Sequence, residues 1–278
     1  MSIIQGVKSE LQRHSKLTII FAVNFVLFFL INISTSIFKT EVIINNLALP
    51  LNLSNFIFKP WTIITYMFSH QSLGHIFYNM LLLYFSAITF LNFLSEKKLW
   101  FAYIVSGLFG ALILLIFSLV SPITFQNSIL LGASAAVIGI VCSMATYLPN
   151  LPINLFGIIE MKYKYYALLV FAITSIIDFN VNTGGKISHF GGAAFGLLFG
   201  YLLKKGKDIS DWAFYSKAQK KSPLKVVHKQ ANYMQTNSAT ENQRMIDELL
   251  DKISKHGYDN LSKSEKELLF KLSNKENK

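Results

Sequence analysis

Four polar side chains interrupt stretches of sequence that are otherwise apolar, and their types suit one reaction: Ser134, His189, His75 and Asn79. A serine hydroxyl is a weak nucleophile until a base takes its proton, which a neutral histidine can do near neutral pH. The tetrahedral oxyanion formed next needs fixed donors, such as a backbone N–H with His and Asn side chains. Because Asp178 lies only at the end of an apolar stretch and no other aspartate lies within one, these residues favour a Ser-His dyad over a triad.

Other chemistries of buried polar residues are poorly supported. A zinc protease helix needs the pattern His-Glu-x-x-His, and no histidine here has that context. An aspartyl mechanism needs two buried carboxylates, and only Asp178 is near, at the end of an apolar stretch where a solvated carboxylate is the simpler interpretation. We therefore expect no metal and no organic cofactor.

The composition indicates a membrane protein. Of 278 residues, 52% are hydrophobic and 15% charged, against about a quarter charged in an ordinary soluble domain. Of the 41 formal charges, 25 fall in the last 74 residues. The net charge of +11 comes from loops that flank apolar segments and from the last 74 residues. Beside the apolar segments, lipid headgroups are a simpler partner for the positive residues than nucleic acid. We expect no nucleic-acid binding and, with the single Cys142, no intramolecular disulfide.

Six apolar stretches are long enough to cross a bilayer core of ~30 Å. They cover approximately residues 17–38, 73–93, 99–120, 129–148, 164–179 and 187–204. The first is too long for a signal peptide and lacks a clear cleavage site, so we expect a retained anchor. Lys and Arg gather in alternate loops, which predicts cytoplasmic N- and C-termini. Segment 42–69 is too apolar for a free loop and too interrupted to cross, so we expect a partly embedded interfacial hairpin.

The polar residues of the apolar stretches agree in depth. Counting residues from the loops places Ser134, His189, His75 and Asn79 several Å to ~10 Å below the outer surface, on three different helices. Each also has an ordinary explanation, since a membrane serine often bonds its own helix and His75 with Asn79 could join two helices. Their shared depth favours a site. A stripe of small residues, Gly192, Gly196 and Gly200, would bring the sixth span against the fourth and His189 to Ser134.

The last part of the chain has a soluble composition. Five lysines between residues 217 and 229 either hold anionic headgroups or belong to a solvated linker. Apolar residues at helical spacing end before Gly257, and Ser262 with Glu265 forms a capping box that starts a second helix. We predict a cytoplasmic N-terminal segment, a six-span domain, a basic linker and a small helical hairpin, at residues 1–16, 17–205, 206–240 and 241–278.

The combined pattern resembles the rhomboid family of intramembrane serine proteases over roughly residues 15–205. The features that carry the resemblance are Pro60-Trp61, His70, His75 and Asn79 at intervals of five and four, Glu96 after the second span, Gly132-x-Ser134 and His189-x-x-Gly192-x-x-x-Gly196. The resemblance implies an all-α, six-span bundle in which Ser134 is the nucleophile and His189 its base. It also implies an oxyanion site formed by the Ser134 N–H, His75 and Asn79.

Further roles follow from the same resemblance. It assigns His70 a structural role near the site, the segment 42–69 a place in the outer leaflet, and the fifth span the role of a lateral gate. The tail resembles a short helical domain of some bacterial members, which implies a bacterial cytoplasmic membrane. The chain departs from the family pattern at four positions: Ala135 replaces a common Gly, Ile138 an aromatic that stacks on the base, Thr62 an Arg, and Trp100 a Gly.

We expect an intramembrane serine endopeptidase that cleaves transmembrane proteins in the bilayer. One alternative is a rhomboid-like pseudoprotease that binds client helices without cutting them. A transporter is a third possibility, but it would need polar residues along the inner half of the bilayer, and the sequence places them mainly at outer depth.

Overall fold

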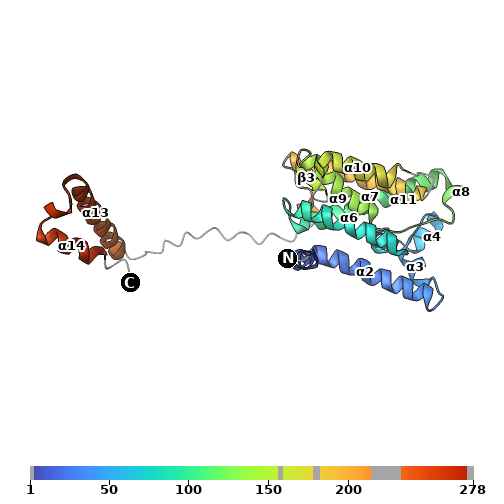
Figure 1. The fold of residues 1–278 in the computed structure, drawn as a ribbon. Coiled ribbons are helices and arrows are strands. Elements are labelled where there is room, and N and C mark those ends of the chain that lie inside the picture. Colours follow the sequence, from blue (N-terminus) through green and yellow to red (C-terminus); the bar gives the residue numbers. More distant parts are fainter. Residues whose placement is uncertain (1–2, 156–158, 178–181, 214–232, 274–278) are drawn as a thin grey trace. The chain divides into compact units, whose positions relative to one another are not determined.

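The computed structural model describes residues 3–155, 159–177, 182–213 and 233–273, and the chain divides into two units, Met1–Ser216 and Lys217–Lys278 (Figure 1). Each of the six predicted stretches overlaps a helix of the first unit. These helices are α2 (Ser15–Ser36), α6 (Leu73–Leu91), α7 (Glu96–Val120), α9 (Ser134–Tyr147), α10 (Tyr163–Ser175) and α11 (Thr183–Lys204). Within the described residues, α2, α6 and α7 are long and apolar enough by themselves to cross a membrane. The chain is an integral membrane protein.

The N-terminal segment is attached to the start of α7. It contains α1 (Ile3–Arg13), and the residues that follow it surround the Glu96 carboxylate. Ser15 Oγ and the Lys16 backbone N–H each donate to Glu96 Oε2 over 3.2 Å, and His14 Nδ1 lies 3.3 Å from Oε1. A carboxylate at the first residue of a helix is favoured by the helix dipole. Glu96 therefore joins two segments that are distant in sequence.

Segment 42–69 is more helical than the expected hairpin. It contains α3 (Val42–Leu47), β1 (Leu49–Pro50), α4 (Leu53–Phe58), α5 (Thr62–Thr65) and η1 (Tyr66–Phe68). The segment folds back on itself, because Trp61 Nε1 donates to the carbonyl of Asn46 over 2.8 Å. Its place in the outer leaflet stays a prediction.

The predicted start of the fourth span is wrong. Residues Ile129–Leu130 form β2, which pairs antiparallel with β1, and the helix begins only at Ser134. Gly132 between them has φ +116°, a conformation that ends the extended segment and that side chains other than glycine's rarely adopt. The apolar run continues through this turn, so hydropathy could not show it.

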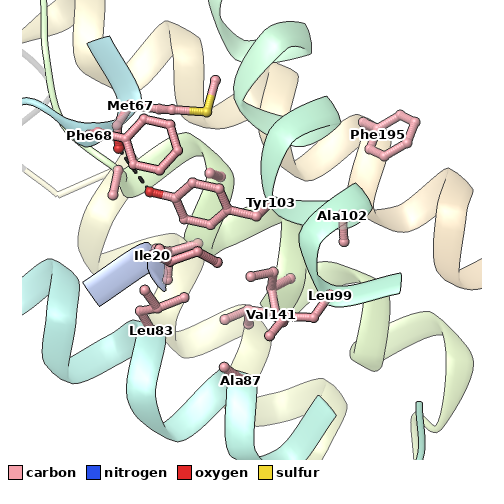
Figure 2. Close-up of a cluster of buried hydrophobic side chains, with 14 of the residues drawn as sticks. Ile20, Met67, Phe68, Leu83, Ala87, Leu99, Ala102, Tyr103, Val141 and Phe195 are labelled. Carbon is pink, nitrogen blue, oxygen red and sulfur yellow. Dashed lines mark hydrogen bonds between the residues drawn. The ribbon is translucent and has the colours of Figure 1, made fainter. Parts of the chain in front are cut away.

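Helix α9 lies at the centre of the first unit and packs against α6, α7, α10 and α11. Every residue from Ala135 to Met144 is buried. Two buried tyrosines tie the core to the segment before α6: Tyr103 donates to the carbonyl of Met67 over 2.9 Å (Figure 2), and Tyr66 to that of Gly107 over 2.7 Å. The segment leading into α6 is thereby fixed against α7.

Other described elements lie at the edges of the first unit. They are α8 (Pro122–Phe125), α12 (Ser210–Ala213) and an antiparallel hairpin of β3 (Pro152–Leu155) and β4 (Ile159–Lys162). The sequence predicted only a basic loop where this hairpin lies. After α11, Lys98 Nζ pairs with Asp208 over 2.8 Å. Burial alone would raise the pKa of Asp208, but hydrogen bonds from Lys98 and Ser210 hold it below the usual value.

The second unit contains the expected pair of helices. They are α13 (Tyr233–His256) and α14 (Lys263–Ser273), joined through η2 (Tyr258–Asn260), so the first helix begins earlier than the predicted 241. The capping box is present: Ser262 N–H donates to Glu265 Oε2 over 2.8 Å, and Glu265 N–H to Ser262 Oγ over 3.4 Å. Most of the predicted linker lies outside the described residues, so the boundaries of the four predicted segments stay predictions.

Candidate active site

Ser134 lies at the N-terminus of α9, directly after the turn at Gly132 and Ala133. As the first residue of the helix, its backbone N–H has no acceptor one turn back. The amide and the hydroxyl of the same residue are therefore both available at a helix end, where the dipole favours negative charge. This is the geometry that a nucleophile with its own oxyanion donor needs.

His189 lies in the second turn of α11 and is 7% exposed. Its Nε2 is 2.7 Å from Ser134 Oγ, a hydrogen bond between residues 55 positions apart. The geometry suits proton transfer between a hydroxyl and an imidazole, for which heavy-atom distances of ~2.6–3.2 Å are required. The structure thus brings together the two residues that the sequence proposed as nucleophile and base.

The other ring nitrogen of His189 contacts the end of α10. Nδ1 is 3.2 Å from the backbone carbonyl oxygen of Thr174 and 3.2 Å from Ser175 Oγ. A carbonyl oxygen can only accept, so we assign the ring proton to Nδ1. The lone pair of Nε2 then points at the Ser134 hydroxyl, as a general base requires. Neither α10 contact belongs to a sequence motif, so neither could be predicted from the sequence.

His75 and His70 contact the two residues that precede Ser134. A Cβ atom on Gly132 would lie 2.6 Å from Cε1 and Nε2 of the His75 ring, so this ring occupies the space that the missing side chain leaves. His70, which is fully buried, accepts a hydrogen bond at Nε2 from the Ala133 N–H over 3.3 Å. The two imidazoles meet edge to face with centroids 4.9 Å apart. Both histidines therefore support the turn before Ser134.

Asn79 lies one helical turn beyond His75 on α6 and is 7% exposed. Its Nδ2 donates to the backbone carbonyl of His75 over 2.9 Å. An amide carries two N–H groups, so this bond uses one of them and leaves the second for another acceptor. Since α6 packs against α9, the expected donor residue lies on a helix that adjoins the one carrying Ser134.

The glycine stripe of α11 lies directly on the backbone of α9. A Cβ on Gly192 would be 2.1 Å from the carbonyl oxygen of Ala135, and one on Gly196 2.2 Å from that of Gly139. Side chains at these positions would push the helices apart. The close approach is what brings His189 within hydrogen-bond distance of Ser134.

Ile138 stands at the position where the family resemblance implies an aromatic residue. It is fully buried in a small cluster with Cys142 and Ala193, against which Phe171 of α10 packs. Phe171 in turn contacts Phe190 edge to face, with centroids 5.0 Å apart. In this chain Ile138 is therefore packed from α10.

Within the residues that the structure describes, no group of three His, Cys, Asp or Glu side chains could hold a metal ion. Asp178, the carboxylate that the sequence analysis considered, lies outside the described residues.

Comparison with known proteins agrees with the geometry. The model of the Rhomboid domain matches residues 58–206, more than half of the 278 residues. A second model, a family of unknown function (DUF6576), matches residues 235–275 and covers most of α13 and all of α14. A search of curated proteins finds no match. The chain therefore belongs to the rhomboid family, whose members are serine proteases that act within membranes.

Proposed function

We propose that this chain is an active intramembrane serine endopeptidase with a Ser134–His189 dyad. The observation that carries the proposal is the 2.7 Å contact between His189 Nε2 and Ser134 Oγ, with Nδ1 held as a donor on the other side of the ring. A ring oriented in this way supports catalysis over client binding alone. The substrates would be transmembrane proteins that reach the site within the bilayer.

The reaction follows from these contacts. His189 Nε2 takes the proton of Ser134 as Oγ attacks the scissile carbonyl carbon, and the oxyanion is held by the Ser134 N–H, His75 and Asn79. The imidazolium then gives its proton to the leaving amine, which leaves an ester on Ser134. Water enters from the outer side and gives a proton to His189 as it attacks the ester. That proton returns to Ser134 Oγ when the acid product leaves.

Two substitutions test the dyad in the full chain reconstituted in liposomes. Ser134→Ala and His189→Ala should each lower cleavage of a labelled single-span substrate by about 10⁴-fold or more. Ser134→Ala should also abolish labelling by a serine-directed fluorophosphonate. Substrate that binds the wild type without being cut, together with no adduct on Ser134, would instead identify a pseudoprotease. Full cleavage by purified Ser134→Ala would rule out the mechanism.

We also propose that all six helices cross the bilayer, with both termini in the cytoplasm of a bacterial cell. The proposal is supported by the alternation of basic loops, which places Lys97 and Thr124 on opposite sides of the membrane. The free Cys142 is buried and can be replaced by alanine. In that background, Thr124→Cys should react with a membrane-impermeant maleimide in intact cells, and Lys97→Cys only after lysis. The reverse result would invert the orientation.

A further inference from the structure

The end of α10 provides the hydrogen-bond partners of His189 Nδ1, the ring nitrogen that faces away from Ser134. Nδ1 of His189 is shared between the Thr174 carbonyl and the hydroxyl of Ser175, each at 3.2 Å, in the manner of a three-centre hydrogen bond. Ser175 is fully buried, so its hydroxyl contacts the imidazole away from bulk water. The Thr174 carbonyl belongs to the last turn of α10. Carbonyls in the last turn of a helix have no N–H donor within that helix, so they can accept a hydrogen bond from a group outside it.

These two groups occupy the place that a carboxylate has in a Ser-His-Asp triad. In a triad the carboxylate orients the imidazole and stabilises the imidazolium that forms when serine attacks. Within the described part of the chain, the polar atoms that meet Nδ1 are both neutral oxygens. They are assisted by the negative end of α10, since helix C-termini favour a nearby positive charge. A hydroxyl and a helix end can thus orient the imidazole and stabilise its charged form, as the buried aspartate of a triad does.

The register of α10 on α11 is fixed on both sides of this contact. On one side Phe171 and Phe190 form an edge-to-face pair at 5.0 Å. On the other side Lys186 Nζ donates to the carbonyl of Ile177 over 2.6 Å. The contact with His189 lies between these two in the antiparallel pair. The position of the α10 backbone at Ser175 relative to the ring therefore follows from contacts on both sides of it.

We propose that Ser175 is a positioning residue of the protease, which holds the His189 ring with its Nδ1 proton toward α10 and stabilises the imidazolium. The proposal deepens the function proposed above and rests on it. Because the hydroxyl acts on the base and does not touch substrate, its loss affects the chemical step and leaves substrate binding unchanged.

The test compares Ser175→Ala with two other variants of the full chain in liposomes. Ser175→Ala should lower kcat by about tenfold with KM unchanged, which is the effect of one hydrogen bond to a charged group. Ser175→Thr keeps the hydroxyl and should restore kcat. Ser188→Ala is the matched control, since Ser188 is also buried next to His189 in the sequence but, among the described residues, its hydroxyl bonds the Gly185 carbonyl of its own helix, over 2.6 Å, and not the His189 ring. It should keep the wild-type kcat.

A spectroscopic readout separates this role from a loss of folding and from failure of the proposed function. In ¹⁵N-histidine-labelled protein, with the His189 signals identified by His189→Ala, the Nδ1 resonance should move in Ser175→Ala and not in Ser188→Ala. An unmoved resonance, a wild-type kcat in Ser175→Ala, or an equal loss in Ser188→Ala would each overturn the proposal. Absence of any Ser134-dependent cleavage in the wild type would overturn the proposed function instead, while the resonance would still report the contact.

Discussion

Replacing Gly192 by alanine should separate the two halves of the dyad. The added Cβ would lie 2.1 Å from the Ala135 carbonyl oxygen, about 1.3 Å inside the distance of 3.4 Å at which ordinary contact begins. The obstacle is backbone, so no side-chain rotation can relieve it, and α11 must move away from α9 by about 1 Å. Since His189 lies one turn from Gly192, its 2.7 Å bond to Ser134 would stretch beyond the 3.5 Å limit. A misplacement of this size costs about 10²-fold in rate, or about 2.7 kcal/mol.

The other stripe glycines give a graded comparison. Gly196 and Gly200 would meet the carbonyl oxygens of Gly139 and Ser143 at 2.2 and 2.1 Å, so all three alanine variants create the same clash. They differ in their distance from the base: about 4.5, 10.5 and 16.5 Å along the helix axis for Gly192, Gly196 and Gly200. Each should lose about 1–3 kcal/mol of stability through overpacking. The loss of kcat should be largest for Gly192→Ala and smallest for Gly200→Ala.

The assay is cleavage of a single-span substrate together with the rate of fluorophosphonate labelling, measured below the Tm of each variant. Gly74→Ala is the control, because nothing lies within 4 Å of the Cβ it would add on α6. Gly192→Ala that cleaves as fast as Gly74→Ala would refute the reasoning. So would equal losses of kcat in the three stripe variants, since these would report general destabilisation and not the position of the base.

Two further predictions concern the turn before the nucleophile and the second unit. Gly132→Ala forces φ +116° on alanine and places its Cβ 2.6 Å from the His75 ring. We therefore expect kcat to fall with little change in KM. An unchanged kcat would count against His75 as an oxyanion donor. Hydrogen bonds from Lys252 and then Ser262 lower the pKa of Glu265 from 4.5 to about 2. Because the pKa is lower in the folded state, this contribution to stability is complete above about pH 4.5 and is lost as the pH falls toward 2. Hydrogen exchange of α13 and α14 in the full chain, corrected for intrinsic rates, should show the loss, and Glu265→Gln should remove this pH dependence.

Much of the first unit was readable because a bilayer imposes simple rules on composition. Six apolar stretches predicted six helices, and five of these begin within about four residues of the expected position. The exception is α9, where the apolar residues Ile129 and Leu130 belong to a strand and only the backbone at Gly132 marks the change. The β3–β4 hairpin was missed for a similar reason, since short strands at the edge of a helical unit have no periodicity long enough to recognise.

The candidate site also contains some features that the sequence could predict and others that it could not. The nucleophile and the base could be proposed from sequence because their residue types are costly in an apolar stretch, and the glycine stripe indicated which spans approach each other. The pairing of Asn79 with the carbonyl of His75 could not be proposed, because a local bond within one helix competes with any bond to a neighbour.

The acceptor for His189 Nδ1 shows why a positioning group is harder to find than a reacting one. Every residue has a carbonyl, so nothing in the type of Thr174 marks its carbonyl as the partner of the base. Its role is set by the register of α10 on α11, which depends on packing contacts such as Phe171 with Phe190. A Ser-His dyad predicted without a third acidic residue therefore still leaves room for a third partner of the ring. Where a helix end faces a base, a backbone carbonyl can orient the ring. A side-chain substitution does not remove that carbonyl, so mutation can test only an adjacent side chain such as the hydroxyl of Ser175.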